Sequence, residues 1–320
     1  MFSLYSLSVS LYMAAHRMKS HKKTANGEAV HSASLKGYFW MATSVCSFVG
    51  LAIATRELSA SFSAFQILFL RSATGAFFVL ASWKWFFRGE LSSASAGLQI
   101  LRNILHFTGQ YLWTLGLLML PLAEAIALEF TTPAWVSLFA ILFLGERVGI
   151  ERLSALLLSF VGVLIVLRPG ISDFDLGTLA MLISAVCFAL SIIVVKKLSK
   201  TSSPAAIVVW MISIQTPLAF VFALSGWVPL DWQYVPWIVI AGLTGMSAHF
   251  ALARALQLLD ASTAVPIDTA RVPIMALAGF LLYNEEIDGW VLLGALLIFG
   301  ANYFAATRQT GPLKTTPPLK

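Results

Sequence analysis

Two stretches of the chain, residues 37–63 (GYFWMATSVCSFVGLAIATRELSASFS) and residues 177–203 (GTLAMLISAVCFALSIIVVKKLSKTSS), align without gaps at an offset of 140 residues. Eight of the 27 positions are identical: Gly37, Met41, Ser44, Phe48, Ile53, Leu58, Ser59 and Ser63 match Gly177, Met181, Ser184, Phe188, Ile193, Leu198, Ser199 and Ser203. Near an offset of 139, Ala125, Glu129, Glu146 and Leu153 meet Ala264, Asp268, Glu285 and Leu292. The chain therefore contains an internal repeat.

The composition places this repeat in a membrane. Hydrophobic residues make up 58% of the chain, charged residues only 11%, and the mean hydropathy is +0.83, whereas about a quarter of a soluble domain is charged. Apolar stretches lie near 37–55, 64–83, 98–119, 122–144, 152–168, 177–195, 205–224, 235–256, 263–283 and 289–306. Each is long enough to cross a bilayer as a helix, and none has the alternation of a barrel strand. The sequence predicts an all-α integral membrane protein with ten transmembrane helices.

An odd number of spans per repeat inverts the second copy, so we expect two inverted five-helix repeats. Lys and Arg in alternate loops divide fifteen against two, the two being Arg56 and Arg168. This asymmetry predicts cytoplasmic termini, and it explains the net charge of +6 without a nucleic-acid partner. The predicted organisation is a cytoplasmic tail over residues 1–35, repeats over 36–169 and 176–308, and a second cytoplasmic tail over 309–320.

Several motifs carry a family resemblance. The first half has the run LPLAEA at 120–125, a helix ending LGER at 144–147, and a further helix closing on LRPG at 167–170. The second half has the weaker echoes DASTA at 260–264 and YNEE at 283–286, with Asn284 in place of the usual Gly. From Gly37 to Arg308 the chain resembles EamA-type carriers of the drug/metabolite transporter superfamily. The resemblance implies a metabolite carrier, often an exporter, in the bacterial inner membrane.

Ionisable side chains at membrane depth are costly and mark candidate functional sites. Arg71, Glu129, Asp268 and Arg271 lie well within their spans. Asp268 and Arg271 are three residues apart and can pair along one helix face. Glu129 is expected to meet Arg71, to hold its proton, or to face a water-filled cavity. We predict Glu129 and Asp268 as the coupling, proton-binding groups.

A polar stripe marks the third predicted helix, because Arg102, His106, Gln110 and Trp113 recur at helical spacing. We expect it to face the bundle interior, either contacting substrate or bonding other helices. For Arg102, as for Glu124 and Arg254, proximity to a helix end leaves snorkelling as an alternative. The predicted substrate-binding residues are Arg71, Arg102, His106, Gln110, Trp113, His249 and Arg271, and His249 corresponds to Gln110 in the repeat.

Two prolines are predicted hinges. Pro133 and Pro273 each follow an acidic position, and proline removes a backbone donor and kinks a helix, although membrane helices also tolerate proline as a purely structural kink. Glu146 and Glu285 end matched helices, and we expect each to cap the N-terminus of the next helix.

The predicted function is secondary transport, outward, of a small polar metabolite by alternating access. The arginines favour an amino acid or an amino-acid-derived compound such as an opine-type metallophore, and the alternative is an uptake carrier for riboflavin, S-adenosylmethionine or a nucleotide-like solute. Motifs of membrane enzymes are missing from the sequence, so an enzyme is not favoured. A channel is also less favoured, because inverted repeats are typical of carriers. No cofactor or metal is expected. The expected partners are the small-molecule substrate and the lipid bilayer, and a homodimer is left open.

Overall fold

The computed structural model describes residues 35–81, 95–145, 150–168, 175–198, 201–202, 204–259, 267–268 and 270–308. Helices form its elements: Leu35–Ser59, α2 (Ala64–Ala81), α4 (Ala96–Met119), α5 (Leu122–Glu129), α6 (Thr132–Leu144), α7 (Ile150–Leu167), α8 (Leu176–Leu198), α9 (Pro204–Ala223), α10 (Val235–Leu258), α12 (Arg271–Tyr283) and α13 (Gly289–Arg308). Short 3-10 turns cover Leu224–Gly226 and Trp232–Tyr234. Each of the ten predicted apolar stretches overlaps a helix, and the stretch 122–144 overlaps two, α5 and α6.

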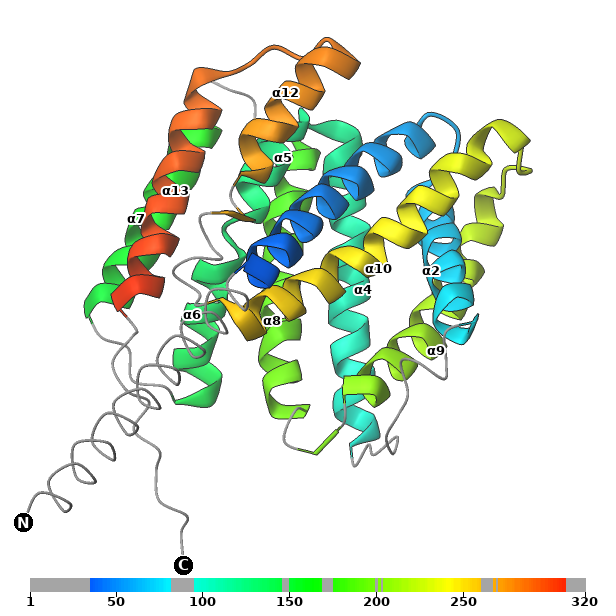
Figure 1. The fold of residues 1–320 in the computed structure, drawn as a ribbon, viewed down its shortest axis with the longest axis horizontal. Coiled ribbons are helices and arrows are strands. Elements are labelled where there is room, and N and C mark those ends of the chain that lie inside the picture. The colour runs from blue at the N-terminus through cyan, green and yellow to red at the C-terminus, as the bar shows by residue number, and fades with distance from the viewer. Residues whose placement is uncertain are drawn as a thin grey trace, which may run out of the picture.

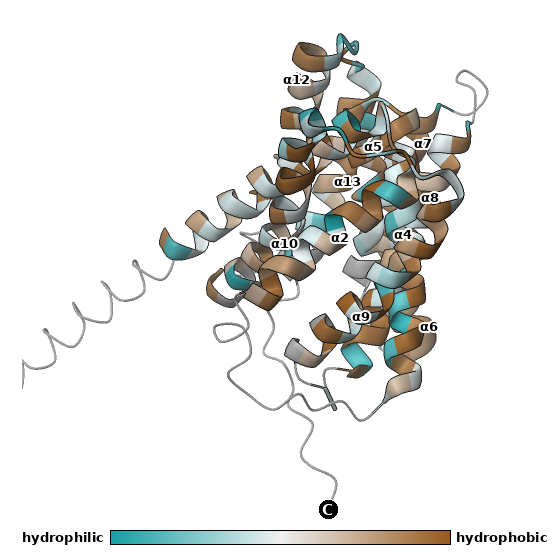
Figure 2. Cartoon of the chain, turned by 90° about the vertical axis from the view of Figure 1, so that its right-hand side faces the viewer, coloured by the Kyte–Doolittle hydropathy of each residue, from teal (hydrophilic) through white to brown (hydrophobic). Residues whose placement is uncertain are grey.

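The outer surface of the bundle is apolar, as a bilayer requires. Six of the described segments are long and apolar enough to cross a membrane, namely Leu35–Ser59, Ala64–Ala81, Leu122–Leu144, Leu176–Leu198, Val209–Gly226 and Trp232–Leu252. Large hydrophobic side chains such as Phe77, Leu142 and Leu281 are more than 60% exposed, and hydrophobic colouring extends along the helices in Figure 2. Such a surface is stable only when lipid covers it. The chain is a multi-pass membrane protein.

The repeated stretches make matching contacts. On α8, Ser184 donates its hydroxyl hydrogen to the Gly109 carbonyl of α4 at 2.8 Å. On the helix Leu35–Ser59, the matched residue Ser44 donates in the same way to the Ala248 carbonyl of α10 at 3.1 Å. Figure 1 shows this first helix beside α10, and α8 beside α4. Gly109 and Ala248 are 139 residues apart, so the offset found in the sequence recurs in the packing.

Helices α7 and α13 pack through glycine, at one side of the bundle in Figure 1. A Cβ at Gly162 would lie 2.9 Å from the Gly294 carbonyl oxygen, and one at Gly294 would lie 2.7 Å from the Gly162 carbonyl oxygen. Real Cβ atoms do not approach backbone this closely. The pair therefore requires glycine on both helices, as in other close membrane-helix contacts.

The predicted span 122–144 is broken in the structure just before Pro133, one of the two predicted hinges. Helix α5 ends at Glu129 and α6 begins at Thr132, with Pro133 in its first turn, where a missing N–H costs no hydrogen bond. Pro273 likewise lies in the first turn of α12. Pro266 lies outside the described residues.

Side chains satisfy the carbonyl groups that the break between α5 and α6 leaves open. The hydroxyl of Thr131 donates to the Leu128 carbonyl and that of Thr132 to the Glu129 carbonyl, both at 2.7 Å. Asn302 of α13 donates to the Phe130 carbonyl at 3.2 Å. Unpaired backbone groups in a membrane cost several kcal/mol each, so these three bonds let the chain change direction inside the bundle.

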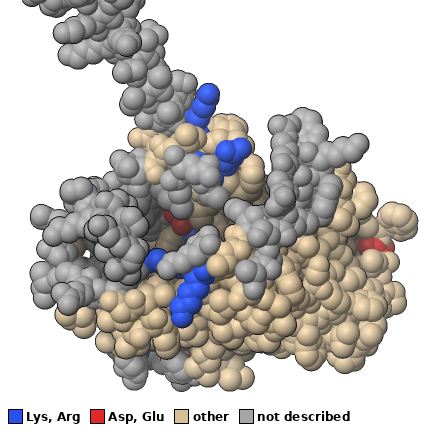
Figure 3. All heavy atoms as spheres, turned by 90° about the horizontal axis from the view of Figure 1, so that it is seen from below, with Lys and Arg blue, Asp and Glu red and all other residues tan. Residues whose placement is uncertain are grey.

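Arg56 lies at one end of the bundle, and Lys196 and Lys197 lie at the other. Arg56 donates to the Leu120 carbonyl at 2.9 Å, at the C-terminal end of α4. Helix α8 packs antiparallel to α4, because Gly116 contacts Met181 whereas Gly109 contacts Phe188. Lys196 and Lys197, in the last turn of α8, therefore lie at the other end of α4, a helix of about 36 Å. Figure 3, a view from below, shows Lys and Arg atoms near the middle of that face.

Candidate functional site

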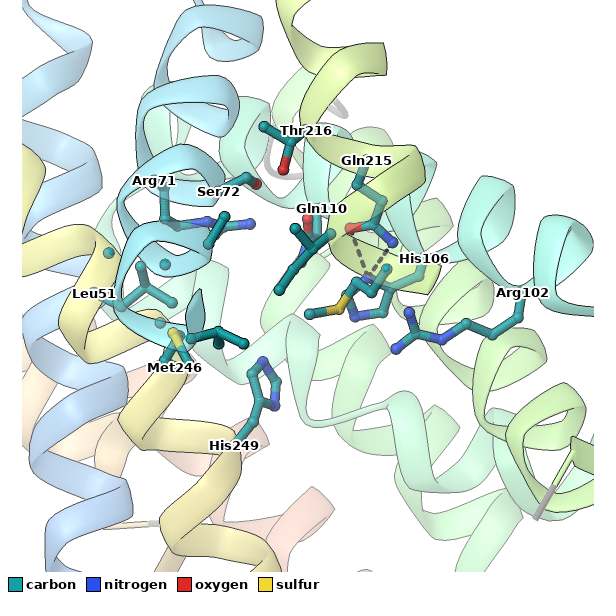
Figure 4. A pocket seen from close by; sticks show the side chains of 17 residues that line it. Leu51, Arg71, Ser72, Arg102, His106, Gln110, Gln215, Thr216, Met246 and His249 are labelled. Carbon is teal, nitrogen blue, oxygen red and sulfur yellow. Dashed lines mark hydrogen bonds between the residues drawn. The ribbon is translucent and has the colours of Figure 1, made fainter. Parts of the chain in front are cut away.

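A cavity of about 280 Å³ lies between α2, α4, α9 and α10 (Figure 4). Its polar lining residues are Arg71, Ser72, Arg102, His106, Gln110, Gln215, Thr216 and His249. Its other lining residues are Leu51, Gly75, Ala76, Val79, Met211, Ile212, Gly242, Gly245 and Met246. Of the seven residues predicted to bind substrate, five line this cavity: Arg71, Arg102, His106, Gln110 and His249.

The cavity wall is basic. Arg71 is 9% exposed and Arg102 is 8% exposed, and in Figure 4 both side chains extend into the space. Arg102 donates to the Asn103 side-chain oxygen at 2.9 Å. The Arg71 guanidinium makes no hydrogen bond or ion pair with any residue in the described ranges. None of the lining residues is acidic, so the arginine charges are not neutralised within the cavity wall.

Gln215 is a site residue that the sequence-based reasoning missed. Its amide nitrogen donates to the Asn103 side-chain oxygen at 2.8 Å, and its amide lies 3.2 Å from Nδ1 of His106. It is 3% exposed and lies within the apolar helix α9. A single glutamine in an apolar span was the available signal, since an amide facing lipid would be costly.

Three buried polar atoms at the cavity have no partner among the described residues: Oε1 of Gln110, Nε of Arg102 and the Thr216 hydroxyl. In Figure 4 the Gln110 and Thr216 side chains lie near the Arg71 side of the space. Buried polar groups in a native protein are nearly always paired. These atoms are therefore available to a bound polar molecule.

Glu129, Asp268 and Arg271 form a second, separate polar cluster. Arg271 is 6% exposed and forms ion pairs with Glu129 at 3.1 Å and with Asp268 at 2.8 Å. Trp113 donates its indole N–H to the second Glu129 oxygen at 2.8 Å. Trp113 and Arg271 thus belong to this network and do not line the cavity. The guanidinium also lies 4.4 Å and 4.6 Å from the ring centres of Phe48 and Phe130, in cation–π contacts.

The partner of Glu129 corrects one expectation. From the sequence, contact with Arg71 was one of three alternatives for Glu129, and the structure pairs Glu129 with Arg271 instead. The reason is the break after α5, which ends at Glu129 and packs against α12, the helix that begins at Arg271. The expected pair of Asp268 and Arg271 is present.

Phe48 connects the two clusters. Its ring makes an edge-on contact with the His249 ring in the cavity wall, with 5.2 Å between ring centres, and it packs on Arg271 in the network. Its repeat counterpart Phe188 contacts His106 with 5.6 Å between ring centres. A movement of Phe48 would therefore affect both clusters.

Further ion pairs gather at the end of the bundle that carries Arg56. Arg56 pairs with Glu285 at 2.9 Å, and Tyr283 donates to Glu57 at 2.9 Å. The other oxygen of Glu285 accepts the Leu122 N–H at 2.8 Å. The expectation that Glu285 caps the following helix was wrong: it caps α5, in the other half of the chain. Glu146 lies outside the described residues.

Arg254 is exposed and lies over the Phe250 ring.

The known proteins that this chain resembles are transporters. The chain is 32% identical to a riboflavin transporter of Vibrio cholerae, over 82% of this chain and 90% of that protein. It is 25% identical to an S-adenosylmethionine uptake transporter of Rickettsia bellii, over 84% of this chain and 92% of that protein. It is also 25% identical to a pseudopaline exporter of Pseudomonas aeruginosa, over 76% of this chain and 86% of that protein.

The fold also resembles that of a solved structure. This crystal structure matches with a TM-score of 0.58 and 18% sequence identity, covering 88% of this chain and 99% of that one. The model of the EamA-like transporter family matches the chain twice, over residues 35–168 and 175–307. The chain is therefore a membrane transporter that belongs to the EamA-like family, within the drug/metabolite transporter superfamily.

Proposed function

We propose that this protein is a secondary carrier of the bacterial inner membrane that moves a small organic solute by alternating access. Its two halves are inverted copies that rock against each other around a central site. The double match to one family model supports the duplication. The equivalent contacts of Ser44 and Ser184, and the location of Arg56 and Lys196 at opposite ends of α4, support the inversion.

The substrate site is the cavity between α2, α4, α9 and α10. The observation that carries this assignment is a basic, hydrogen-bonding pocket enclosed in an apolar bundle. Burying Arg71 and Arg102 costs free energy that a purely structural role does not recover, because neither meets a carboxylate in the described part of the chain. A cavity that binds a polar solute does recover it.

The relatives name three chemically different substrates, and the charge of the cavity helps to rank them. An amino-acid-derived solute, whose carboxylates suit the arginines, is the first candidate, supported by the pseudopaline exporter relative. Riboflavin is uncharged and offers the arginines only neutral acceptors, so it is the second candidate. S-adenosylmethionine carries a carboxylate but also a sulfonium and an ammonium cation, which a wall containing Arg71 and Arg102 disfavours. We place uptake ahead of export, because the S-adenosylmethionine relatives that cover most of the chain are uptake transporters by name.

The Arg271 network is the coupling site in this proposal. Glu129 belongs to the first half, whereas Asp268 and Arg271 belong to the second, so the ion pair joins the halves. Protonation of Glu129 would weaken that connection and allow the halves to separate, with Pro133 and Pro273 at the starts of α6 and α12 as the hinges. The groups that face Glu129 are Arg271 and Trp113, and His249 lies beyond Phe48.

The proposal is tested by reconstituting the purified protein in liposomes and measuring counterflow of labelled amino-acid-derived solutes, and then of riboflavin. A carrier gives saturable uptake that is accelerated by the same solute inside the vesicle. Uptake that rises linearly with concentration and shows no such acceleration would identify a channel and would contradict the proposal.

A further inference from the structure

We infer that the solute carries an acidic group, a carboxylate or a phosphate, and that this group binds the Arg71 guanidinium. This inference rests on the cavity being the substrate site. It goes further than the names of the relatives, which include an uncharged and a cationic solute.

Four arginines from the sequence were candidates for binding an anion, and the structure removes two of them. Arg254 is exposed, and Arg271 is already neutralised by Glu129 and Asp268. Arg71 and Arg102 are left, both more than 90% buried and both lining the cavity.

Of these two arginines, Arg71 has the fewer hydrogen bonds within the described residues. Arg102 already donates to Asn103, whereas the Arg71 fork has no hydrogen-bonding partner among the described residues. The aliphatic part of Arg71 runs over Gly245 of α10, where an added Cβ would lie 3.4 Å from Cδ of Arg71. The glycine leaves room for the side chain, and Figure 4 shows the guanidinium directed into the cavity toward Gln110.

A buried guanidinium stays charged, because arginine does not deprotonate in proteins. Removing such a charge from water costs several kcal/mol unless a counter-charge meets it. The lining residues supply two such cations and no anion. The missing negative charge is therefore best supplied by the solute, and the planar fork of arginine matches the oxygens of a carboxylate or a phosphate.

The rest of the wall indicates what surrounds the acidic group. Leu51, Val79, Met211, Ile212 and Met246 give the cavity a large apolar area. Methionine adapts its shape to flat and irregular apolar groups. The solute is thus an amphiphilic anion, with its acidic end at Arg71 and an apolar body against these side chains.

The test is uptake into proteoliposomes from one equimolar mixture, measured by mass spectrometry. The mixture contains riboflavin, riboflavin 5′-phosphate, S-adenosylmethionine, which has a carboxylate, and amino-acid derivatives of similar size whose carboxylate is either free or converted to an amide. We expect the accumulated solutes to share a carboxylate or a phosphate. Arg71→Gln should lower their uptake at least about tenfold, the size of a lost charge-assisted hydrogen bond, and should not lower uptake of solutes that lack such a group.

Arg254→Gln is the matched control, since it removes the same charge from an exposed position and should leave the profile unchanged. Thermal unfolding of each purified variant confirms that it is folded. Accumulation of a solute without a carboxylate or a phosphate, at a rate that Arg71→Gln leaves unchanged, would overturn the inference while leaving the carrier intact. If wild-type protein accumulates nothing from the mixture or in counterflow, the proposed function itself fails.

Discussion

Arg271 joins the two halves of the chain through an ion pair with Glu129. It is shared by Glu129 from the first half and Asp268 from the second, and it lies between the rings of Phe48 and Phe130. A buried cation with two carboxylates leaves one negative charge in excess, which protonation can remove. This arrangement suits a group that must be stable in one state of the carrier and separable in another.

Exchange of Glu129 for Gln should abolish pH-driven transport while the protein remains in the membrane. Glutamine keeps the shape and can still accept the Trp113 N–H, but it cannot bind and release a proton. Uptake with and without an imposed proton gradient measures the effect. Glu124→Gln, on the same helix but outside the network, is the control. Gradient-driven uptake equal to that of the wild type would remove Glu129 from the coupling mechanism.

Exchange of Arg271 for Gln should destabilise the protein, because it leaves Glu129 and Asp268 as two buried carboxylates without their shared cation. Breaking a buried pair in this way costs about 3–5 kcal/mol. Thermal unfolding in detergent should show a clearly lowered midpoint, and further exchange of Glu129 for Gln should restore part of it. A midpoint equal to that of exposed Arg254→Gln would show that the network contributes little to stability.

At this scale the sequence indicated the charged residues and the pairing of Asp268 with Arg271, but not the partner of Glu129. Charged residues in apolar spans are visible in the sequence, and Glu129, Asp268 and Arg271 were found for that reason. Which arginine meets Glu129 depends on a contact between residues 142 positions apart and on the break after α5, so Arg271 was not among the partners considered for Glu129. Gln215 was missed because an uncharged amide is a weaker signal than a charge.

Among the elements, α7 and α13 depend most directly on single glycines. Exchange of Gly294 for Val should separate these helices, because its Cβ would lie 2.7 Å from the Gly162 carbonyl oxygen. Overpacking costs about 1–3 kcal/mol, and a backbone contact cannot relax as a side chain can. Thermal unfolding measures the loss. Gly300→Val on the same helix, where a Cβ has open space, should have little effect, and equal losses would contradict this account.

Glu285 links α12 to the start of α5. Exchange of Glu285 for Gln removes the Arg56 ion pair and the negative charge at the α5 N-terminus. Together these should lower stability by about 1–2 kcal/mol. Thermal unfolding at low and high salt checks this, with exposed Glu286→Gln as the control. An unchanged midpoint for Glu285→Gln would show that the cap is dispensable.

Apolar stretches predicted the helices well because a bilayer leaves the backbone few alternatives. Breaks within a stretch were harder to predict. Residues 122–144 are apolar throughout, and the hydrogen bonds from Thr131, Thr132 and Asn302 that permit the break come partly from α13, far away in the sequence.

For the whole molecule, the internal repeat was the most informative feature of the sequence. It predicted which helices correspond, and the contacts of Ser44 with Ala248 and of Ser184 with Gly109 follow the same offset. The cavity itself was not visible in the sequence, since it is formed by four helices from both halves. Five of the polar residues lining it could be found one by one in the sequence, but not their separation from the Arg271 network.

Inversion of the two halves is the claim on which the transport mechanism depends most. It is tested by labelling single cysteines in intact cells with a membrane-impermeant thiol reagent, after replacement of Cys46 and Cys187. Ala60→Cys and Lys197→Cys are exposed positions in the two matched stretches. The account predicts that Ala60→Cys is labelled from outside and that Lys197→Cys is labelled only after the membrane is opened. Labelling of both from the same side would contradict it.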